Sequence, residues 1–280
     1  MQRSSTLGLI VPDTYNPYFA EVARGVEHVA FQHGYTVMLC HSGYDVEREV
    51  HYVDVLREHM VAGVIWIPAT SNPESIRKLT EYGIPAVVLD RQVTWGQVVS
   101  VTVDNFRGGY LATKHLIDLG HRNIGCIARP VELTHSQQRV EGYRTALQEH
   151  GLPIVSELVA RGGLRLENGR DATNVLLDLP NPPTAIFTYN DAMAIGALRA
   201  AYERGLRVPN DISIVGFDDI PQAAFTCPAL TTIAQPKFDM GSCGAELLLT
   251  MIAKKAAPAG LEKPLEVELI VRESTGPASR

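Results

Sequence analysis

Short apolar runs alternate with helix-length segments along the first part of this chain. Predicted strands cover residues 7–11, 36–40, 64–68, 86–89 and 99–103, and predicted helices cover residues 17–33, 46–60, 73–82 and 105–119. The helices stop at or near Gly34, Gly63, Gly83 and Gly120, where glycine takes the left-handed cap without strain. Continuous apolar strands separated by such helices predict right-handed βαβ units and a parallel sheet.

The same alternation starts again at residue 123. Predicted strands cover residues 123–128, 159–161, 185–188, 212–217 and 265–271, with an extended segment at 230–235 and helices at 136–150, 166–179, 191–204 and 237–255. No low-complexity linker separates the two parts, and residues 256–260 form the last loop. The expected fold class is therefore α/β, in two successive units of similar size.

Polar side chains follow directly after three of the apolar runs. The run that ends in Val215-Gly216-Phe217 continues into Asp218-Asp219, residues 87–89 run into Asp90-Arg91, and residues 186–188 run into Asn190-Asp191. Ligands of open α/β sheets bind at the carboxyl ends of the strands, and buried carboxylates require partners. The pattern predicts a receptor for a small polar molecule.

Composition excludes several other classes. A net charge of −6 and a pI near 5.8 argue against this chain alone gripping nucleic acid. No run of about 18 apolar residues is present, and the first six residues do not form an apolar signal segment. The four cysteines are scattered without a Cys-x-x-Cys pair. We expect a cytoplasmic protein with reduced thiols and no membrane partner.

Several short motifs occur in a fixed order over nearly the whole chain. They are residues 7–13 followed by Asn16-Pro17-Tyr18-Phe19, residues 119–125, Arg139-Val140-Glu141-Gly142-Tyr143, residues 190–194, residues 215–219, and residues 230–233 followed by Gln235-Pro236. Together they resemble the effector domain of the LacI/GalR transcriptional regulators and their relatives, the periplasmic sugar-binding proteins.

The resemblance implies a type I periplasmic-binding-protein-like fold, with two doubly wound parallel-sheet lobes joined by three crossovers and a ligand in the cleft between them. The first lobe would hold residues 1–121 plus 236–257, and the second residues 122–235 plus 258–280. The family's DNA-binding helix-turn-helix precedes the first strand and is absent from this chain, so operator DNA is an expected partner only through that head. A homodimeric repressor is implied, with helices 17–33 and 46–60 as candidate core and dimer surfaces.

Five residues of the first lobe are candidate ligand groups. Asn16 can bond a hydroxyl, and Tyr18 or Phe19 can stack on a sugar ring or a base. The alternative is that Asn16 caps the helix and Phe19 belongs to the core. Asp90 and Arg91 can share vicinal hydroxyls, as the resemblance to ribose-type binding proteins implies, or can form only a surface ion pair.

In the second lobe, Arg139, Asn190 and Asp218 match ligand-binding positions of the family. Asn190 is alternatively a helix N-cap, and Arg139 is a candidate partner for the Asp218 carboxylate. Gln235 either reaches the ligand or bonds the backbone at the hinge. Further, weaker assignments place Asp219 as a cap or hinge acceptor, Ser136 as a loop contact or a cap, and His135 as a solvated loop residue.

This polar set favours a pentose or a similar polyol as the ligand, with a hexose as an alternative. Residues 162–166 read Gly-Gly-Leu-Arg-Leu where many relatives have an aromatic residue, which weakens a purine assignment. No dinucleotide or phosphate-binding glycine loop, nucleophile elbow, His-Glu-x-x-His or zinc spacing occurs. We therefore expect no cofactor, no metal and no catalysis. A transport-type sugar-binding protein and an enzyme on a similar bilobal fold remain the alternatives.

Overall fold

The computed structural model describes residues 4–70, 72, 74–91, 98–129, 134–254 and 264–278. The chain divides into two compact units. Unit 1 is Met1–Val103 with Pro236–Leu265, and unit 2 is Asp104–Gln235 with Glu266–Arg280. The chain thus passes from one unit to the other three times, after residues 103, 235 and 265.

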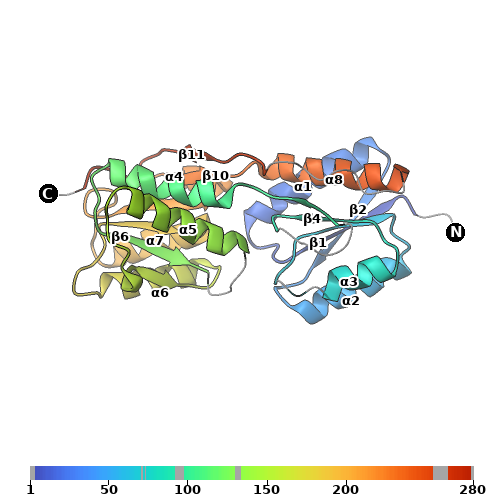
Figure 1. The fold of residues 1–280 in the computed structure, drawn as a ribbon, viewed down its shortest axis with the longest axis horizontal. Helices are drawn as coiled ribbons and strands as arrows, with labels where there is room; N and C mark the ends of the chain where they lie inside the picture. The colour runs from blue at the N-terminus through green and yellow to red at the C-terminus, as the bar shows by residue number, and fades with distance from the viewer. Residues whose placement is uncertain are drawn as a thin grey trace. The chain divides into compact units, whose positions relative to one another are not determined.

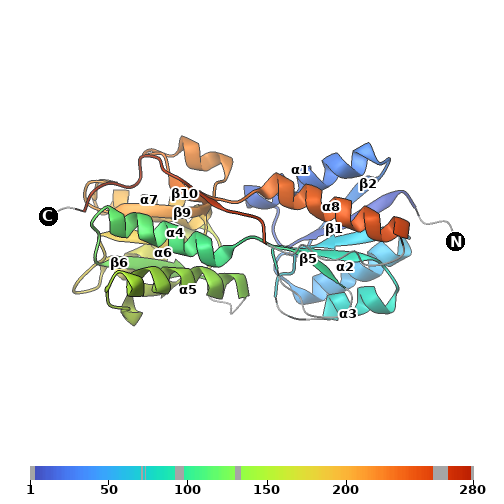
Figure 2. The ribbon, with the colours of Figure 1, turned by 45° about the horizontal axis from the view of Figure 1, so that its top comes forward.

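Unit 1 is built around a five-stranded parallel sheet in the order β2-β1-β3-β4-β5. Its strands are β1 (Thr6–Val11), β2 (Thr36–His41), β3 (Gly63–Trp66), β4 (Ala86–Leu89) and β5 (Val99–Val101). Its helices are α1 (Pro17–Gln32), α2 (Val46–Glu58), α3 (Glu74–Glu81) and α8 (Lys237–Lys254). Helices α1 and α8 lie side by side on one face of the sheet, and α2 and α3 lie on the other (Figures 1 and 2).

Glycines set the close approach of α1 and α8. A Cβ added at Gly25 would lie 2.1 Å from the carbonyl oxygen of Phe238, and one at Gly241 would lie 2.1 Å from that of Val22. Any side chain at these two positions would push the helices apart.

Unit 2 holds a six-stranded sheet in the order β11-β10-β9-β8-β6-β7. Its strands are β6 (Ile124–Ala128), β7 (Val159–Arg161), β8 (Ala185–Thr188), β9 (Ser213–Asp218), β10 (Thr231–Ala234) and β11 (Glu268–Ile270). Its helices are α4 (Asn105–Asp118), α5 (Thr134–Glu149), α6 (Leu166–Leu177) and α7 (Asp191–Glu203), with short 3-10 turns at Ser156–Leu158 and Pro221–Phe225. Helix α4 packs against α5, and α6 packs against α7 (Figure 1).

Apolar side chains of the strands and helices form a core in each unit. In unit 1 the buried cluster includes Val53, Leu56 and Trp66. In unit 2 it includes Leu176 and Met193. Every residue of β3, β4, β8 and β9 is buried, as expected of strands covered on both faces. The predicted fold class, two parallel α/β sheets, is confirmed.

Three details differ from the sequence-based expectations. Unit 2 begins at Asp104, so α4 belongs to it and not to the first lobe, because α4 packs on α5 and on strands of that sheet. The last strand is only β11, and it runs antiparallel to β10. Strand β9 ends at Asp218 itself. The predicted start of a helix at residue 73 and the loop at 256–260 lie outside the described residues.

Candidate functional site

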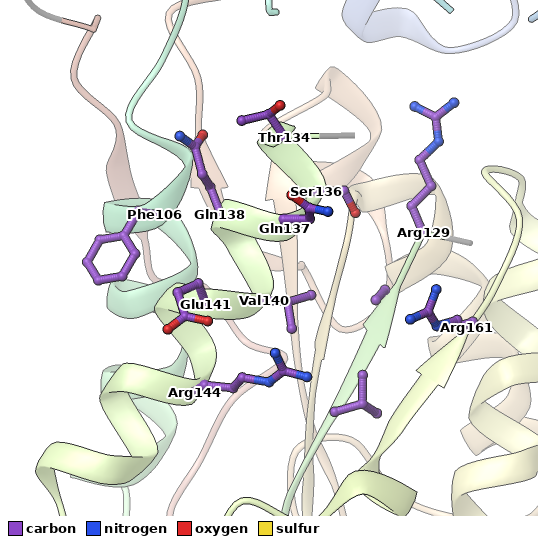
Figure 3. A pocket seen from close by; sticks show the side chains of 12 residues that line it. Phe106, Arg129, Thr134, Ser136, Gln137, Gln138, Val140, Glu141, Arg144 and Arg161 are labelled. Carbon is purple, nitrogen blue, oxygen red and sulfur yellow. The ribbon is translucent and has the colours of Figure 1, made fainter. Parts of the chain in front are cut away.

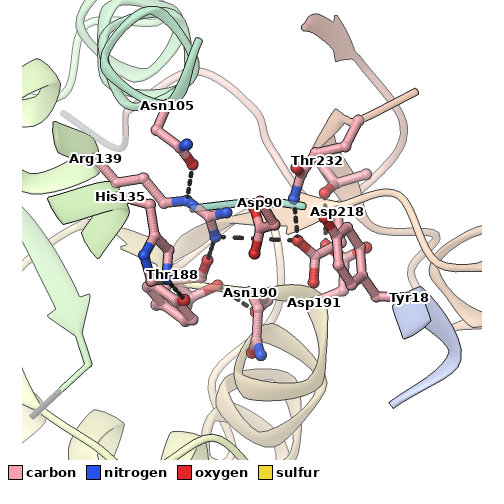
Figure 4. Close-up of polar contacts among 12 residues, drawn as sticks. Tyr18, Asp90, Asn105, His135, Arg139, Thr188, Asn190, Asp191, Asp218 and Thr232 are labelled. Atoms are coloured by element: carbon pink, nitrogen blue, oxygen red, sulfur yellow. Dashed lines mark hydrogen bonds and ion pairs between the residues drawn. The ribbon is translucent and has the colours of Figure 1, made fainter. Parts of the chain in front are cut away.

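Arg139 occupies the centre of a polar cluster in unit 2. It lies on α5, is buried, and its Nε donates to Asn105 Oδ1 at 2.8 Å while one Nη donates to the Tyr189 carbonyl at 2.6 Å (Figure 4). The guanidinium carbon lies 3.6 Å from the centre of the Phe217 ring and 4.6 Å from that of Tyr189. Aromatic faces attract a guanidinium, so these contacts hold the fork in one orientation.

The Asp218 carboxylate, at the end of β9, is the acidic partner of this cluster. Its Oδ1 lies 3.9 Å from Arg139 Nη1 and accepts a hydrogen bond from Gln235 Nε2 at 2.7 Å. The proposed pairing of Arg139 with Asp218 is therefore confirmed, and Gln235 joins the same cluster. The next carboxylate, Asp219, instead accepts from Arg272 at 2.7 Å, in keeping with the acceptor role expected for it.

A second carboxylate, that of Asp191, accepts hydrogen bonds from groups close to Asp218. Asp191 is fully buried, accepts from the backbone N–H of Ile220 at 2.8 Å, and accepts from the Thr232 hydroxyl. Burial, and then the charge of Asp218, raise the pKa of the Asp191 carboxyl well above its usual range. A Cβ at Gly216 would lie 2.1 Å from Asp191 Oδ1. The glycine between Val215 and Phe217 thus leaves room for this carboxylate.

His135 differs from its sequence-based interpretation. Helix α5 begins at Thr134, so His135 and Ser136 lie in its first turn and are buried. His135 Nε2 and the Tyr189 hydroxyl are hydrogen-bonded at 2.6 Å. The expectation of a solvated loop histidine is wrong, because the helix starts two residues before the predicted position and turns the ring inward.

Asn190 and Asn16 both serve as helix caps. Asn190 Oδ1 accepts from Met193 N–H at 2.9 Å at the start of α7, and Asn16 Oδ1 accepts from Tyr18 N–H at 3.0 Å at the start of α1. The capping alternatives are confirmed for both residues. This use of Oδ1 does not engage the amide nitrogen as a donor, so a capping asparagine keeps a group that can bond a ligand.

In unit 1, the aromatic pair Tyr18 and Phe19 opens α1 after β1. Both are buried, their rings meet edge to face at 5.1 Å, and the Tyr18 hydroxyl donates to Met240 Sδ on α8 at 3.4 Å. These contacts make both residues part of the packing of unit 1.

Asp90 and Arg91 directly follow β4 and form a buried ion pair. Arg91 donates to the Asp90 carboxylate and, at 2.9 Å, to the Asp90 carbonyl oxygen, and both side chains are almost fully buried. The alternative of a surface ion pair is wrong, because both side chains are buried. Asp90 has a φ of 60°, and Asp218 in unit 2 has a φ of 120°. Such conformations cost about 1–3 kcal/mol for a non-glycine residue and concentrate at functional sites.

Glu49 on α2 lies behind this pair. Its Oε1 accepts from Ala69 N–H at 2.8 Å and from the Ser42 hydroxyl at 3.4 Å. Burial raises the pKa of the Glu49 carboxyl to about 7, although the charge of Arg91 acts in the opposite direction. Unit 1 thus contains a buried carboxyl that titrates near neutrality.

Sequence reasoning missed four participants: Glu49, Asn105, Tyr189 and Asp191, the last of which it quoted only as part of a motif. Tyr189 and Asp191 flank a strand-end asparagine that was selected, so their position carried a signal. Glu49 and Asn105 lie on helices, where a polar residue normally faces solvent.

Within the described ranges, no three metal-ligating side chains gather at one point, and no helix is long and apolar enough to cross a membrane. The four cysteines are free.

Comparisons with known proteins give one consistent result. The family model "Periplasmic binding proteins and sugar binding domain of LacI family" matches residues 4–270. The HTH-type transcriptional regulator DegA of Bacillus subtilis is 36% identical over an alignment that covers 99% of this chain and 82% of that protein. The HTH-type transcriptional repressor CytR of Escherichia coli is also 36% identical, over 97% of this chain and 80% of that protein.

Solved structures agree with the sequence comparisons. The transcription regulator CcpA of Lactococcus lactis has a TM-score of 0.90 at 28% identity, covering 98% of this chain and 100% of that chain. A LacI family transcriptional regulator from Enterococcus faecium with bound ribose has a TM-score of 0.88 at 34% identity, with the same coverage.

Proposed function

The chain belongs to the LacI family of transcriptional regulators, whose effector domain it comprises, and we propose that it senses a small sugar, a pentose or a similar polyol. One observation carries this proposal. In each unit a buried carboxylate ends a strand in a left-handed or strained backbone conformation and lies beside a guanidinium group: Asp90 with Arg91, and Asp218 with Arg139.

Such pairs suit vicinal hydroxyl groups. A carboxylate accepts two hydrogen bonds and a guanidinium donates several, so together they match a hydroxyl pair that both donates and accepts. Asn16, Tyr18, Phe19, Asn190 and Gln235 complete the proposed set of ligand groups. The relative from Enterococcus faecium that was solved with ribose, at 34% identity, supports this ligand class.

The proposed mechanism is a shift between conformations. A sugar that bonds groups of both units favours the conformations in which both sets reach it, and only this differential affinity can move the equilibrium. In the regulator, that shift would change the affinity for operator DNA, in the cytoplasm where the DNA lies. The relatives described above are transcriptional regulators and not enzymes or transport proteins, which favours this function over the other two.

Calorimetric titration with ribose, other pentoses, hexoses, polyols and purines tests the ligand. We expect saturable pentose binding that Asp218→Asn or Asp90→Asn weakens about tenfold or more, since each removes a charged acceptor. Asp171→Asn, an exposed carboxylate on α6, is the matched control and should leave binding unchanged. Binding of a purine alone, or of nothing in the panel, would refute the sugar assignment.

We propose in addition that the regulator is a homodimer. In unit 1, Phe31 on α1 and Leu39 on the edge strand β2 expose large apolar side chains, which a partner copy could cover. Sedimentation equilibrium should give about twice the chain mass of 30.6 kDa. A strict monomer at high protein concentration would contradict this.

A further inference from the structure

A concave site that the proposed sugar groups do not use lies in unit 2, beside α5. It is a cavity of about 520 Å³, bordered by α5 and by the ends of β6 and β7. From α5 it is lined by Ser136, Val140 and Arg144, which recur every four residues and so share one face of the helix. Arg139 projects from another face of α5 into the polar cluster described above, so the two sites share no residue.

Two arginines reach this cavity from opposite walls. Figure 3 shows the guanidinium group of Arg144 extending from α5 toward the strands, and that of Arg161 on the opposite side, at the end of β7, with Val140 on the α5 side above Arg144. A third arginine, Arg129, follows β6 and also lines the cavity.

The charge and shape of the cavity define the chemistry it can bind. Among the described residues that line it, Arg144 and Arg161 bring guanidinium groups to the cavity, and Glu141 is the one acidic residue. Guanidinium forks donate paired hydrogen bonds to phosphate and carboxylate oxygens. Ala128, Val140 and Val159 supply an apolar surface for a carbon body. The volume is typical of small-molecule sites.

We propose that this cavity is a second ligand site, which binds a small organic anion with a phosphate or carboxylate group on a compact apolar body. Arg144 and Arg161 hold the anionic group from two sides, and the valines contact the body. The site does not depend on the proposed sugar function, because no residue is common to the two.

The test uses four probes of defined charge: phenyl phosphate, benzoate, benzyl alcohol and inorganic phosphate. Each is titrated at low ionic strength into protein with 13C-labelled valine methyl groups, and affinities are measured by calorimetry. We expect phenyl phosphate or benzoate to shift the methyl signals of Val140 and Val159 saturably, and neutral benzyl alcohol to leave them unchanged. The affinities for phenyl phosphate and benzoate show whether the site prefers a phosphate or a carboxylate group. The difference in affinity between phenyl phosphate and inorganic phosphate measures how much the apolar body contributes to binding.

The affinities of single-residue variants test whether the anion binds in this cavity. Arg144→Gln and Arg161→Gln should each weaken the preferred probe about tenfold or more, because each removes a charge-assisted hydrogen-bond donor. Arg199→Gln, an exposed arginine on α7, should not. Asp218→Asn should weaken sugar binding about tenfold or more and leave anion binding unchanged, which separates the two proposals. Unshifted valine signals up to about 10 mM of every anion, or equal affinity in the wild type and both cavity variants, would overturn the proposal.

Discussion

Replacing Glu49 by glutamine should change how the stability of unit 1 depends on pH. The Glu49 side chain is 1% exposed, and its Oε1 accepts the two hydrogen bonds from Ala69 and Ser42. Burial raises its pKa to about 7, from an ordinary value of 4.5. Glutamine keeps an acceptor oxygen at the same place and carries no charge at any pH.

The direction of this pH dependence follows from the number of protons bound in the folded and unfolded states. Between pH 4.5 and 7 the unfolded chain has lost the Glu49 proton and the folded chain has kept it, so the free energy of unfolding falls as pH rises through this window. Below pH 4.5 both states are protonated and the penalty vanishes. At about 1.4 kcal/mol per pH unit, the full penalty above pH 7 is roughly 3 kcal/mol.

Urea unfolding followed by tryptophan fluorescence measures this effect. The two tryptophans of the chain, Trp66 and Trp95, both belong to unit 1 by their position in the sequence. We expect Glu49→Gln to gain stability over the wild type progressively from pH 5 to pH 8, toward a difference of about 3 kcal/mol. Glu47→Gln, an exposed residue two positions earlier on the opposite side of α2, should show no such trend. A stability difference that is the same at pH 5 and pH 8 would refute the reasoning.

Three further predictions concern unit 2 and the cysteines. Gly216→Ala should lower stability by about 1–3 kcal/mol in thermal unfolding, since its Cβ would collide with Asp191, and an unchanged midpoint would contradict this. Burial lowers the pKa of His121, so the free energy of unfolding should fall as pH drops below about 6.5. In unfolding followed by circular dichroism, His121→Asn should show a smaller loss of stability over this pH range. A loss identical to that of the wild type would exclude His121 as its source. In thiol titration with a disulfide reagent, exposed Cys227 should react at once and buried Cys126, whose pKa burial raises to about 12, only after unfolding in urea; equal native rates would contradict this.

The sequence predicted the fold class because its pattern is local. Apolar runs and glycine-terminated helices repeat at short range, and each strand or helix was located within a few residues of its observed bounds. The boundary between the units was placed at residue 121 and lies at 103, because nothing local shows that α4 packs on α5. The helix start at Thr134 was missed for a related reason, so His135 was assigned to solvent.

For the candidate site, the positions of the acidic residues along the chain can be read from the sequence, whereas their surroundings cannot. The sequence by itself determined which acids end strands, as with Asp90 and Asp218, because strand ends can be read from apolar runs. Only the tertiary structure decided which groups surround them: the aromatic faces on Arg139, the burial of Glu49, and the meeting of Arg144 with Arg161 across a cavity. Burial and partner distances depend on how elements far apart in the chain pack together, and that packing sets the charge state and orientation of each side chain.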